Sequence, residues 1–243
     1  MESSRASKKY NGLKWPPLIS GRLVQRYRRF LADVRLNSGE TVTAHCPNTG
    51  SMAECCEVGR TVYLSRHDNP RRKLEYTWEL IDMPASLVGV NTLVPNRLVA
   101  FSASAGQIPE LEGYSDLQRE VRVGNRSRID LLLTAPGRRS CYVEVKNCTL
   151  VRDGIALFPD AVTSRGQKHL QELEKKALAG DRGVIFFFIQ RQDARQFQPA
   201  DSIDPAYGRF LRRAVGKGVE ALAYDVAIDL EGIRLRRRLP CRL

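Results

Sequence analysis

Short runs of alternating apolar and polar residues dominate the first third of the chain and predict β-strands joined by tight turns. The runs are rich in β-branched and aromatic residues, and Asn, Ser, Gly and Pro occupy the segments between them. The expected strands are residues 18–24, 30–36, 41–45, 61–65 and 76–81. Short strands at this density are typical of a small barrel, so the pattern predicts an OB-like β-barrel over residues 13–84.

From residue 85 onward the pattern changes to longer segments that alternate between helical and strand periodicity. Residues 183–190 are continuously apolar, as in a strand that is covered on both faces of a mixed sheet. Helices are expected after the capping-box pattern Ser164-x-x-Gln167 and after Asp204-Pro-Ala-Tyr207. Further strands are expected near residues 117–123, 219–225 and 233–238, and a helix near 96–105. The segment 85–243 is therefore predicted to be an α/β domain with a mixed sheet.

Residues 128–147 are predicted to form a β-hairpin that carries the chemistry of this second domain. Two apolar runs flank a turn-like loop that contains Gly137. If the hairpin is centred on Gly137, Asp130 lies opposite Glu144, and directly opposed residues share a face. Lys146 follows two residues after Glu144 and points to the same side of the strand. The hairpin thus predicts two carboxylates and an ammonium group on one face.

This group of side chains suits a divalent cation and a phosphodiester. Asp130, Glu144 and the carbonyl oxygen of Val145 are hard oxygen ligands, which Mg²⁺ or Mn²⁺ prefers. Such a metal polarises a phosphodiester and activates water, while Lys146 is placed to orient the water. The pattern Asp-x(n)-Glu-x-Lys resembles the core motif of PD-(D/E)XK nucleases. The alternative is a hairpin with a salt-bridged, solvent-facing side.

The net charge of +12 and the pI of about 9.7 favour association with a polyanion. The alternative is a basic protein whose charge serves solubility alone. Residues 1–30 contain eight Lys and Arg residues against one acid, and five Arg residues cluster between 234 and 242. Residues 1–12 are polar without periodicity and are expected to form a disordered basic leader. Clustered charge is typical of a surface that follows phosphates.

The candidate nucleic-acid-binding residues are cations in turns or beside the candidate catalytic acids. They are Arg28, Arg29, Arg71, Arg72, Lys73, Arg126, Arg128, Arg165 and Lys168. Aromatic residues of the barrel, such as Phe30 and Trp78, are expected either to stack on bases or to fill the core.

The sequence argues against several other classes of protein. No apolar run approaches the ~18 residues of a membrane span, and the N-terminus lacks a signal-peptide core. The six cysteines form no C-x-x-C pair, so neither a zinc site nor a disulfide framework is indicated. We expect a cytoplasmic protein with no membrane partner. The oligomeric state is left open, and a homodimer is one option.

Several longer motifs resemble one bacterial family over almost the whole chain, from about Leu18 to Pro240. They include His45-Cys-Pro-Asn-Thr-Gly-Ser-Met, Val88-Gly-Val-Asn-Thr-x-x-Pro-Asn-Arg-Leu-Val, Tyr142-Val-Glu-Val-Lys and Phe158-Pro-Asp-Ala-Val-Thr-x-Arg-Gly-x-Lys-His-Leu. These motifs are similar to those of the sugar fermentation stimulation protein A family. The chain departs from the family pattern in the leader and at Ala53-Glu-Cys-Cys, where a glycine is usual.

The resemblance implies a two-domain α+β/α/β protein. An N-terminal OB-like barrel would be followed by a PD-(D/E)XK, restriction-endonuclease-like domain. It also implies DNA binding without marked sequence preference and a role in regulating maltose metabolism. The nuclease motif of that fold carries over onto Asp130, Glu144 and Lys146.

Three functions therefore remain open from the sequence. The first is a metal-dependent nuclease with Mg²⁺ or Mn²⁺ at Asp130 and Glu144. The second is a non-enzymatic DNA-binding regulator, whose affinity would come from phosphate contacts. The third is an RNA-binding or RNA-processing factor, because an OB fold does not separate DNA from RNA. All three functions have nucleic acid as the expected partner, and DNA is expected before RNA.

Overall fold

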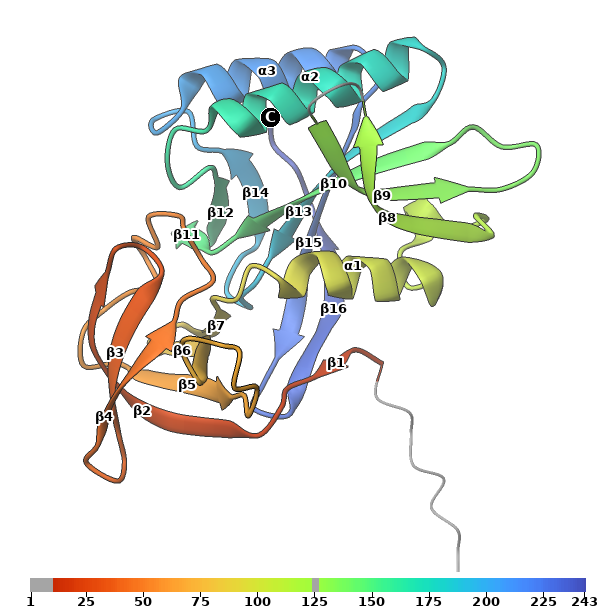
Figure 1. Cartoon of the computed structure of the whole chain (residues 1–243). Helices are drawn as coiled ribbons and strands as arrows, with labels where there is room; N and C mark the ends of the chain where they lie inside the picture. The colour runs from red at the N-terminus through yellow and green to blue at the C-terminus, as the bar shows by residue number, and fades with distance from the viewer. Residues whose placement is uncertain (1–10, 124–126) are drawn as a thin grey trace, which may run out of the picture.

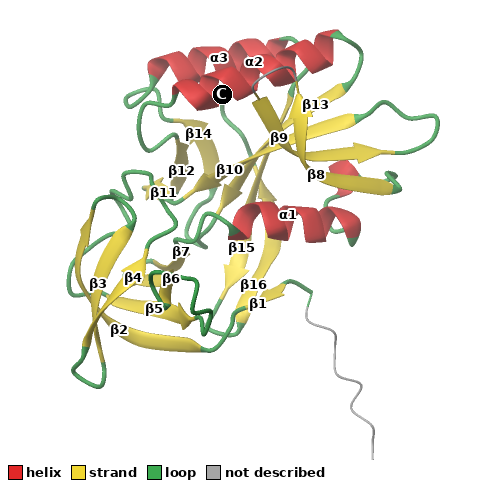
Figure 2. Cartoon of the chain, viewed as in Figure 1, coloured by secondary structure: helices red, strands yellow, loops and turns green. Residues whose placement is uncertain are grey.

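A computed structural model describes residues 11–123 and 127–243 and shows a β-barrel beside a larger mixed sheet that carries three helices (Figures 1 and 2). The predicted two-domain architecture is confirmed. Residues 1–10 of the predicted leader, and Arg126, lie outside the described residues. No helix in the described ranges is both long and apolar enough to cross a membrane.

The N-terminal barrel is built from strands that were all expected except the last. Its sheet contains β2 (Leu18–Tyr27), β3 (Leu31–Leu36), β4 (Thr41–His45), β5 (Thr61–Arg66), β6 (Tyr76–Met83) and β7 (Ser86–Gly89). The strand order is β4-β3-β2-β5-β6-β7, and parallel pairing of β4 with β6 closes the barrel. Because β7 pairs with β6, the barrel sheet continues past residue 84, where the sequence placed the domain boundary.

Alternating side chains of the barrel strands point inward and form one apolar core. Leu23, Val34, Leu64 and Trp78 are all completely or almost completely buried there. Trp78 is therefore core and not a stacking platform, whereas Phe30 in the β2–β3 turn is exposed. Burial of the alternate residues fixes the register of each strand, since a shift by one residue would expose the core set.

The second domain is organised around a seven-stranded sheet of order β1-β16-β15-β13-β10-β9-β8. Its strands are β1 (Leu13–Lys14), β8 (Asp116–Val123), β9 (Ser127–Thr134), β10 (Cys141–Cys148), β13 (Arg182–Ile189), β15 (Glu220–Ile228) and β16 (Gly232–Leu239). The apolar strand β13 is buried along almost its whole length, as its composition predicted, and it runs parallel to both β10 and β15. Residues 13–14 pair with β16 and so belong to this sheet, although the sequence assigned them to the barrel.

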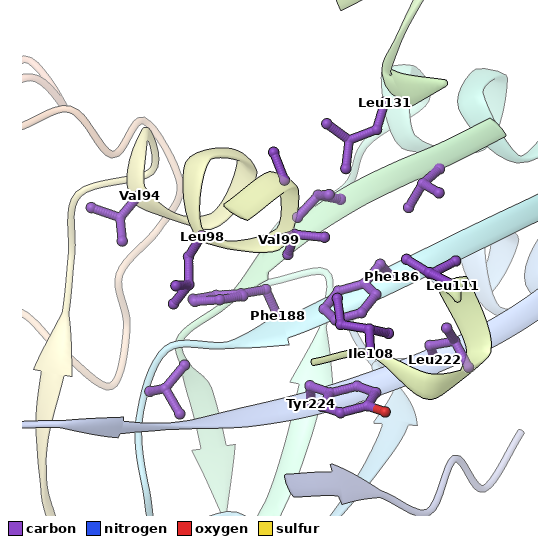
Figure 3. Packing of buried hydrophobic residues seen from close by; sticks show 14 of the residues in the cluster. Val94, Leu98, Val99, Ile108, Leu111, Leu131, Phe186, Phe188, Leu222 and Tyr224 are labelled. Atoms are coloured by element: carbon purple, nitrogen blue, oxygen red, sulfur yellow. The ribbon is translucent and has the colours of Figure 1, made fainter. Parts of the chain in front are cut away.

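Helices cover both faces of this sheet (Figure 1). Helix α1 (Val94–Ser104) packs on one face, where Leu98 and Val99 join Phe186 and Phe188 in one apolar cluster (Figure 3). Helices α2 (Ser164–Leu178) and α3 (Pro205–Gly216) pack on the other, against the alternate residues of β13 such as Phe187. A central strand that buries both faces is thus sandwiched between helices.

Smaller elements complete the domain and were not expected from the sequence. A three-stranded sheet of order β11-β12-β14 contains β11 (Leu150–Arg152), β12 (Ile155–Phe158) and β14 (Gln196–Pro199), and a single 3-10 turn, η1, spans Pro109–Leu111. These segments are only three or four residues long, too short for periodicity to reveal.

The start of α2 differs from the predicted capping box by one residue. Thr163 is the N-cap: it has an extended backbone, and its Oγ1 accepts a hydrogen bond of 3.0 Å from the N–H of Gly166. The Gln167 side chain donates to the carboxylate of Asp204 and does not reach back to the cap. The expected cap at Ser164 is therefore wrong, because Asp204 also binds the N–H of Thr163 and fixes the helix entry there.

Candidate functional site

The β9–β10 hairpin has the predicted register, but its ladder ends one pair before the two acids. Val143 pairs with Leu131, and the next pair would join Glu144 to Asp130. No backbone pairing is formed there among the described residues. Instead the Asp130 carboxylate, through Oδ2, accepts a hydrogen bond of 2.7 Å from the N–H of Val145. The side chain thereby takes the place of a ladder partner and is held against β10.

Glu144 and Lys146 form a buried ion pair on the face of β10 that is covered by α2. Lys146 Nζ lies 2.7 Å from Glu144 Oε1, and His169 of α2 contacts the same oxygen through Nδ1. The exposed fraction is only 2% for Glu144 and 5% for His169. Arg165 Nε lies 3.5 Å from His169 Nε2. This arrangement favours the imidazole tautomer with its proton on Nδ1, which donates to Glu144.

The two carboxylates experience opposite electrostatic environments. Burial, with the Glu144 charge nearby, raises the pKa of Asp130 to about 6, although Val145, Lys146 and Asn96 oppose the shift. For Glu144, burial raises the pKa, but Lys146 and His169 together outweigh it and hold the pKa below its ordinary value. Glu144 is therefore ionised at neutral pH, while Asp130 titrates close to it. Perturbed pairs of this kind are common at functional sites.

One atom of this cluster is left without a hydrogen-bond partner. Glu144 Oε2 is buried and meets no donor from the described residues. A buried carboxylate oxygen without a partner is costly unless a ligand satisfies it. A divalent cation held by Glu144 Oε2 and the Asp130 carboxylate fits this donor set. No group of three or more His, Cys, Asp and Glu suited to a metal occurs within the described ranges, so such an ion would need water, a phosphate or a carbonyl to complete its shell.

An open cavity of about 1000 Å³ lies in front of Asp130. Three of the predicted nucleic-acid-binding cations, Arg128, Arg165 and Lys168, line it. Its wall also includes Asn96 of α1, which donates a hydrogen bond of 2.7 Å to Asp130 Oδ1. The cavity therefore brings two carboxylates, Asp130 and Glu120 of β8, together with these three cations at the start of α2. The cations suit the phosphates of a polyanion, and the Asp130 carboxylate suits a metal ion that one of those phosphates also contacts.

The other predicted cations lie on the barrel. Arg28 and Arg29 occupy the β2–β3 turn with left-handed backbone φ values of 49° and 65°, and both are exposed. Arg71 and Lys73 are exposed in the β5–β6 loop, whereas Arg72 is half-buried and bonds to Thr77. These two loops are the ones through which OB folds commonly hold nucleic acid.

Val145, the predicted carbonyl ligand, packs its side chain toward α1 in the core.

Sequence reasoning missed the contributions of Asn96 and His169 to the site. Asn96 lies 34 positions before Asp130, and no local pattern connects them. His169 occurred in the sequence only as part of a longer motif, and its contact with Glu144 depends on how α2 crosses β10. A helical spacing of four residues between Arg165 and His169 could have suggested that they share a face.

Comparison with known proteins agrees with this architecture. The family described as sugar fermentation stimulation protein RE domain matches residues 93–232, and that described as SfsA N-terminal OB domain matches residues 24–90. The chain belongs to the sugar fermentation stimulation protein family. The two matches meet just beyond β7, which is the last strand of the barrel sheet.

Curated relatives in the family match over nearly their whole lengths. The sugar fermentation stimulation protein homolog of Geobacter sulfurreducens is 59% identical over 224 residues, covering 92% of this chain and 96% of that protein. The homolog of Pelobacter propionicus is 57% identical over 228 residues, covering 94% and 99%.

A solved structure in the family has the same fold. It is described as the structure of Pyrococcus furiosus SfsA in complex with Ca²⁺. The TM-score is 0.88 at 28% sequence identity, and the match covers 95% of this chain and 98% of that one. That family member therefore holds a divalent cation on this fold.

Proposed function

We propose that the protein is a metal-dependent phosphodiesterase that binds nucleic acid, with DNA as its main substrate. Asp130, Glu144 and Lys146 would form its catalytic site. The observation that carries the proposal is the unpartnered, buried Oε2 of Glu144, whose charge acts on Asp130, together with the cavity that Asp130 lines with three cations. A protein that only bound phosphates would gain nothing from the buried Glu144 and the half-buried Asp130, because like charge repels the ligand.

The residues divide into those that hold a cation and those that hold the phosphate. Asp130 and Glu144, with the carbonyl of Val145 as the predicted third ligand, would hold Mg²⁺ or Mn²⁺. When bound, the ion would supply Lewis-acid stabilisation of the charge that develops on the phosphate. Lys146 keeps Glu144 ionised and would place its ammonium beside the attacking water. His169 fixes the Glu144 carboxylate from the other side.

The cavity wall would position the strand. Arg128 on β9 and Arg165 and Lys168 on α2 approach the cavity from different elements, so they can contact successive phosphates. The barrel cations Arg28, Arg29, Arg71 and Lys73, and Arg126 outside the described residues, would extend this contact. Affinity of this kind depends on salt and little on sequence.

The Ca²⁺ in the Pyrococcus furiosus structure supports a divalent cation on this fold, and the hard oxygen ligands favour Mg²⁺ or Mn²⁺ for catalysis. All six cysteines are free thiols, which fits a reducing compartment such as the cytoplasm.

A second candidate is a DNA-binding regulator without catalysis, as the name of the family suggests for sugar metabolism. One specific observation favours it: Glu144 Oε1 is already shared by Lys146 and His169, so that half of the carboxylate is neutralised within the protein. A homodimer remains one option for either function.

A cleavage assay separates the two candidates. Labelled single- and double-stranded DNA and RNA would be incubated with Mg²⁺, Mn²⁺ or EDTA. Wild type would be compared with Asp130→Asn and with Asp116→Asn, an exposed carboxylate at the start of β8. Metal-dependent cutting that is lost in Asp130→Asn but kept in Asp116→Asn supports the nuclease. Binding without cutting on every substrate would leave the regulator.

A further inference from the structure

A second, smaller pocket lies at the junction of the barrel and the second domain. Its volume is about 270 Å³. Trp15 after β1, His45 at the end of β4, Arg72 of the β5–β6 loop and Arg97 of α1 meet around it. The pocket therefore depends on the way that the two domains pack together, and neither domain forms it alone.

The polar wall of this pocket is predominantly positive. Arg72 is oriented by a hydrogen bond of 3.0 Å from its Nη2 to Thr77 Oγ1. Arg97 is exposed and bonds to none of the described residues, so its guanidinium is available to a ligand. Glu79, which also lines the pocket, is buried, and its two oxygens accept 2.7 Å hydrogen bonds from Ser65 and Asn91. The carboxylate is thus internally satisfied and leaves the cations to face an anion.

The remaining wall is apolar and contains one aromatic ring. Trp15 is held in place because its Nε1 donates a hydrogen bond of 2.8 Å to the backbone oxygen of Asp229. Pro47 and Leu93 contribute further apolar surface. A fixed aromatic ring beside arginine guanidinium groups is the combination on which unpaired bases stack while their phosphates are neutralised.

The pocket adjoins the main cavity through the first turn of α1. Leu93 lines both, and its side chain is 64% exposed between them. Asn96 bonds to Asp130 in the main cavity, and the next residue, Arg97, lines the junction pocket. One helical turn therefore faces the candidate metal ligands on one side and the cationic pocket on the other.

We propose that the junction pocket binds an unpaired nucleotide next to the phosphate that is cleaved, with its base on Trp15 and its phosphate on Arg72 and Arg97. The proposal rests on the proposed function, which places the scissile phosphate at Asp130. Leu93 separates this nucleotide from its neighbour in the main cavity.

The consequence is a preference for single strands or unpaired ends. A base that is stacked and paired in a duplex cannot enter a pocket of this size unless it leaves the helix, which costs unstacking energy. The chain would therefore cleave a strand where it is already unpaired.

Tryptophan fluorescence reports on this pocket directly. The chain contains two tryptophans, and Trp78 is completely buried in the barrel core. Asp130→Asn protein in EDTA would be titrated with a single-stranded oligonucleotide, with the matching duplex and with a free nucleoside monophosphate. Saturable quenching by the single strand, absent in the additional variant Trp15→Phe, is the expected result.

The role of Arg97 is tested by measuring binding and cleavage in the same variants. Arg97→Ala should weaken single-strand binding about tenfold, since one charge-assisted contact is lost, with no change for the duplex. Arg139→Ala is the matched control, because Arg139 is an exposed arginine in the β9–β10 loop that lines neither cavity. Cleavage of single strands by the same variants in otherwise wild-type protein should follow the order of their affinities.

The outcomes distinguish the two proposals. Quenching that depends on Trp15 and Arg97, in a protein that cleaves nothing, keeps the pocket and overturns the nuclease. Single-strand cleavage in which Arg97→Ala equals Arg139→Ala overturns the pocket and keeps the nuclease. Equal affinity for the free nucleoside monophosphate and the single strand overturns the proposed place of the pocket beside the cleaved phosphate.

Discussion

Asn96 donates a 2.7 Å hydrogen bond from Nδ2 to Oδ1 of Asp130 and so ties the start of α1 to the candidate metal site. The other oxygen of the same carboxylate is held by the N–H of Val145. Asp130 is therefore oriented from two elements that lie 34 and 15 residues away in the chain. Pre-organisation of a ligand in this way is what a functional site requires.

Loss of the Asn96 contact should shift the pH dependence of the site. The Asn96 hydrogen bond favours the ionised form of Asp130, whose pKa is about 6. In Asn96→Ala that pKa rises, so a proton competes more strongly with the metal. We expect the acidic limb of the cleavage-rate profile, measured with Mn²⁺, to move to higher pH.

Asn37→Ala serves as the control, because Asn37 makes a hydrogen bond to Ser20 on the exposed side of the barrel. An acidic limb that stays in place in Asn96→Ala would show that Asp130 does not control the profile.

Asp130→Asn should stabilise the metal-free protein at neutral and alkaline pH. Burial raises the pKa of Asp130 from 3.8 to about 6, so the folded protein binds this proton more tightly than the unfolded chain. The stability gained from this tighter protonation of Asp130 is present in full below pH 4 and is lost as the pH rises through 6. Ionisation then costs up to about 3 kcal/mol, which the neutral amide avoids. Urea unfolding in EDTA at pH 4 and pH 8 measures the difference.

The difference between Asp130→Asn and wild type should be large at pH 8 and small at pH 4. A variant that is less stable than wild type at both values would contradict the assigned cost of the buried carboxylate.

Divalent cations should largely offset this cost in wild type. Ca²⁺ at about one hundred times its dissociation constant stabilises a protein that binds it by about 2.7 kcal/mol. We expect a higher melting temperature for wild type on addition of Ca²⁺ or Mn²⁺, and no change for Asp130→Asn. A shift of the same size in both proteins would place the bound ion elsewhere.

The helix cap provides a stability test that does not depend on function. Thr163→Ala removes the hydrogen bond to Gly166 and should lower the free energy of unfolding by about 1 kcal/mol. Ser164→Ala should change it by only a few tenths of that amount, because Ser164 is exposed and is not the cap. Equal losses in the two variants, measured by urea unfolding, would restore Ser164 as the cap.

Barrel cations should contribute to affinity through salt-dependent phosphate contacts. Arg71→Ala and Lys73→Ala should each reduce the slope of log affinity against log salt concentration by about 1 on DNA. Arg139→Ala is again the control. An unchanged slope in both barrel variants would remove the β5–β6 loop from the nucleic-acid interface.

The sequence predicted most of the fold because its strands alternate clearly or, as in β13, are continuously apolar. The hairpin register followed from a turn centred on Gly137, and Val143 does pair with Leu131. Periodicity could not show that the ladder stops at this pair, since that depends on the Asp130 side chain bonding to Val145.

Long-range contacts account for what the sequence did not show. His169 reaches Glu144 only because α2 packs across β10, and Arg97 meets Arg72 only because the barrel docks beside α1. The short strands of the β11-β12-β14 sheet carry too few residues for a pattern. These features arise from tertiary packing, whereas the acids and the lysine were visible because they share one hairpin.

The measurement that tests the central claim most directly is the single-turnover cleavage of labelled DNA in Mn²⁺ by Lys146→Ala and Lys175→Ala, with binding measured on the same samples. Lys175 is the middle residue of a second Glu-x-Lys sequence, Glu174-Lys175-Lys176, on α2. Its side chain is mostly exposed and paired to Glu172. The account predicts a loss of at least about a hundredfold in rate for Lys146→Ala with DNA binding retained, and a wild-type rate for Lys175→Ala. Equal rates in the two variants, or no cleavage by a wild-type protein that binds DNA, would contradict it.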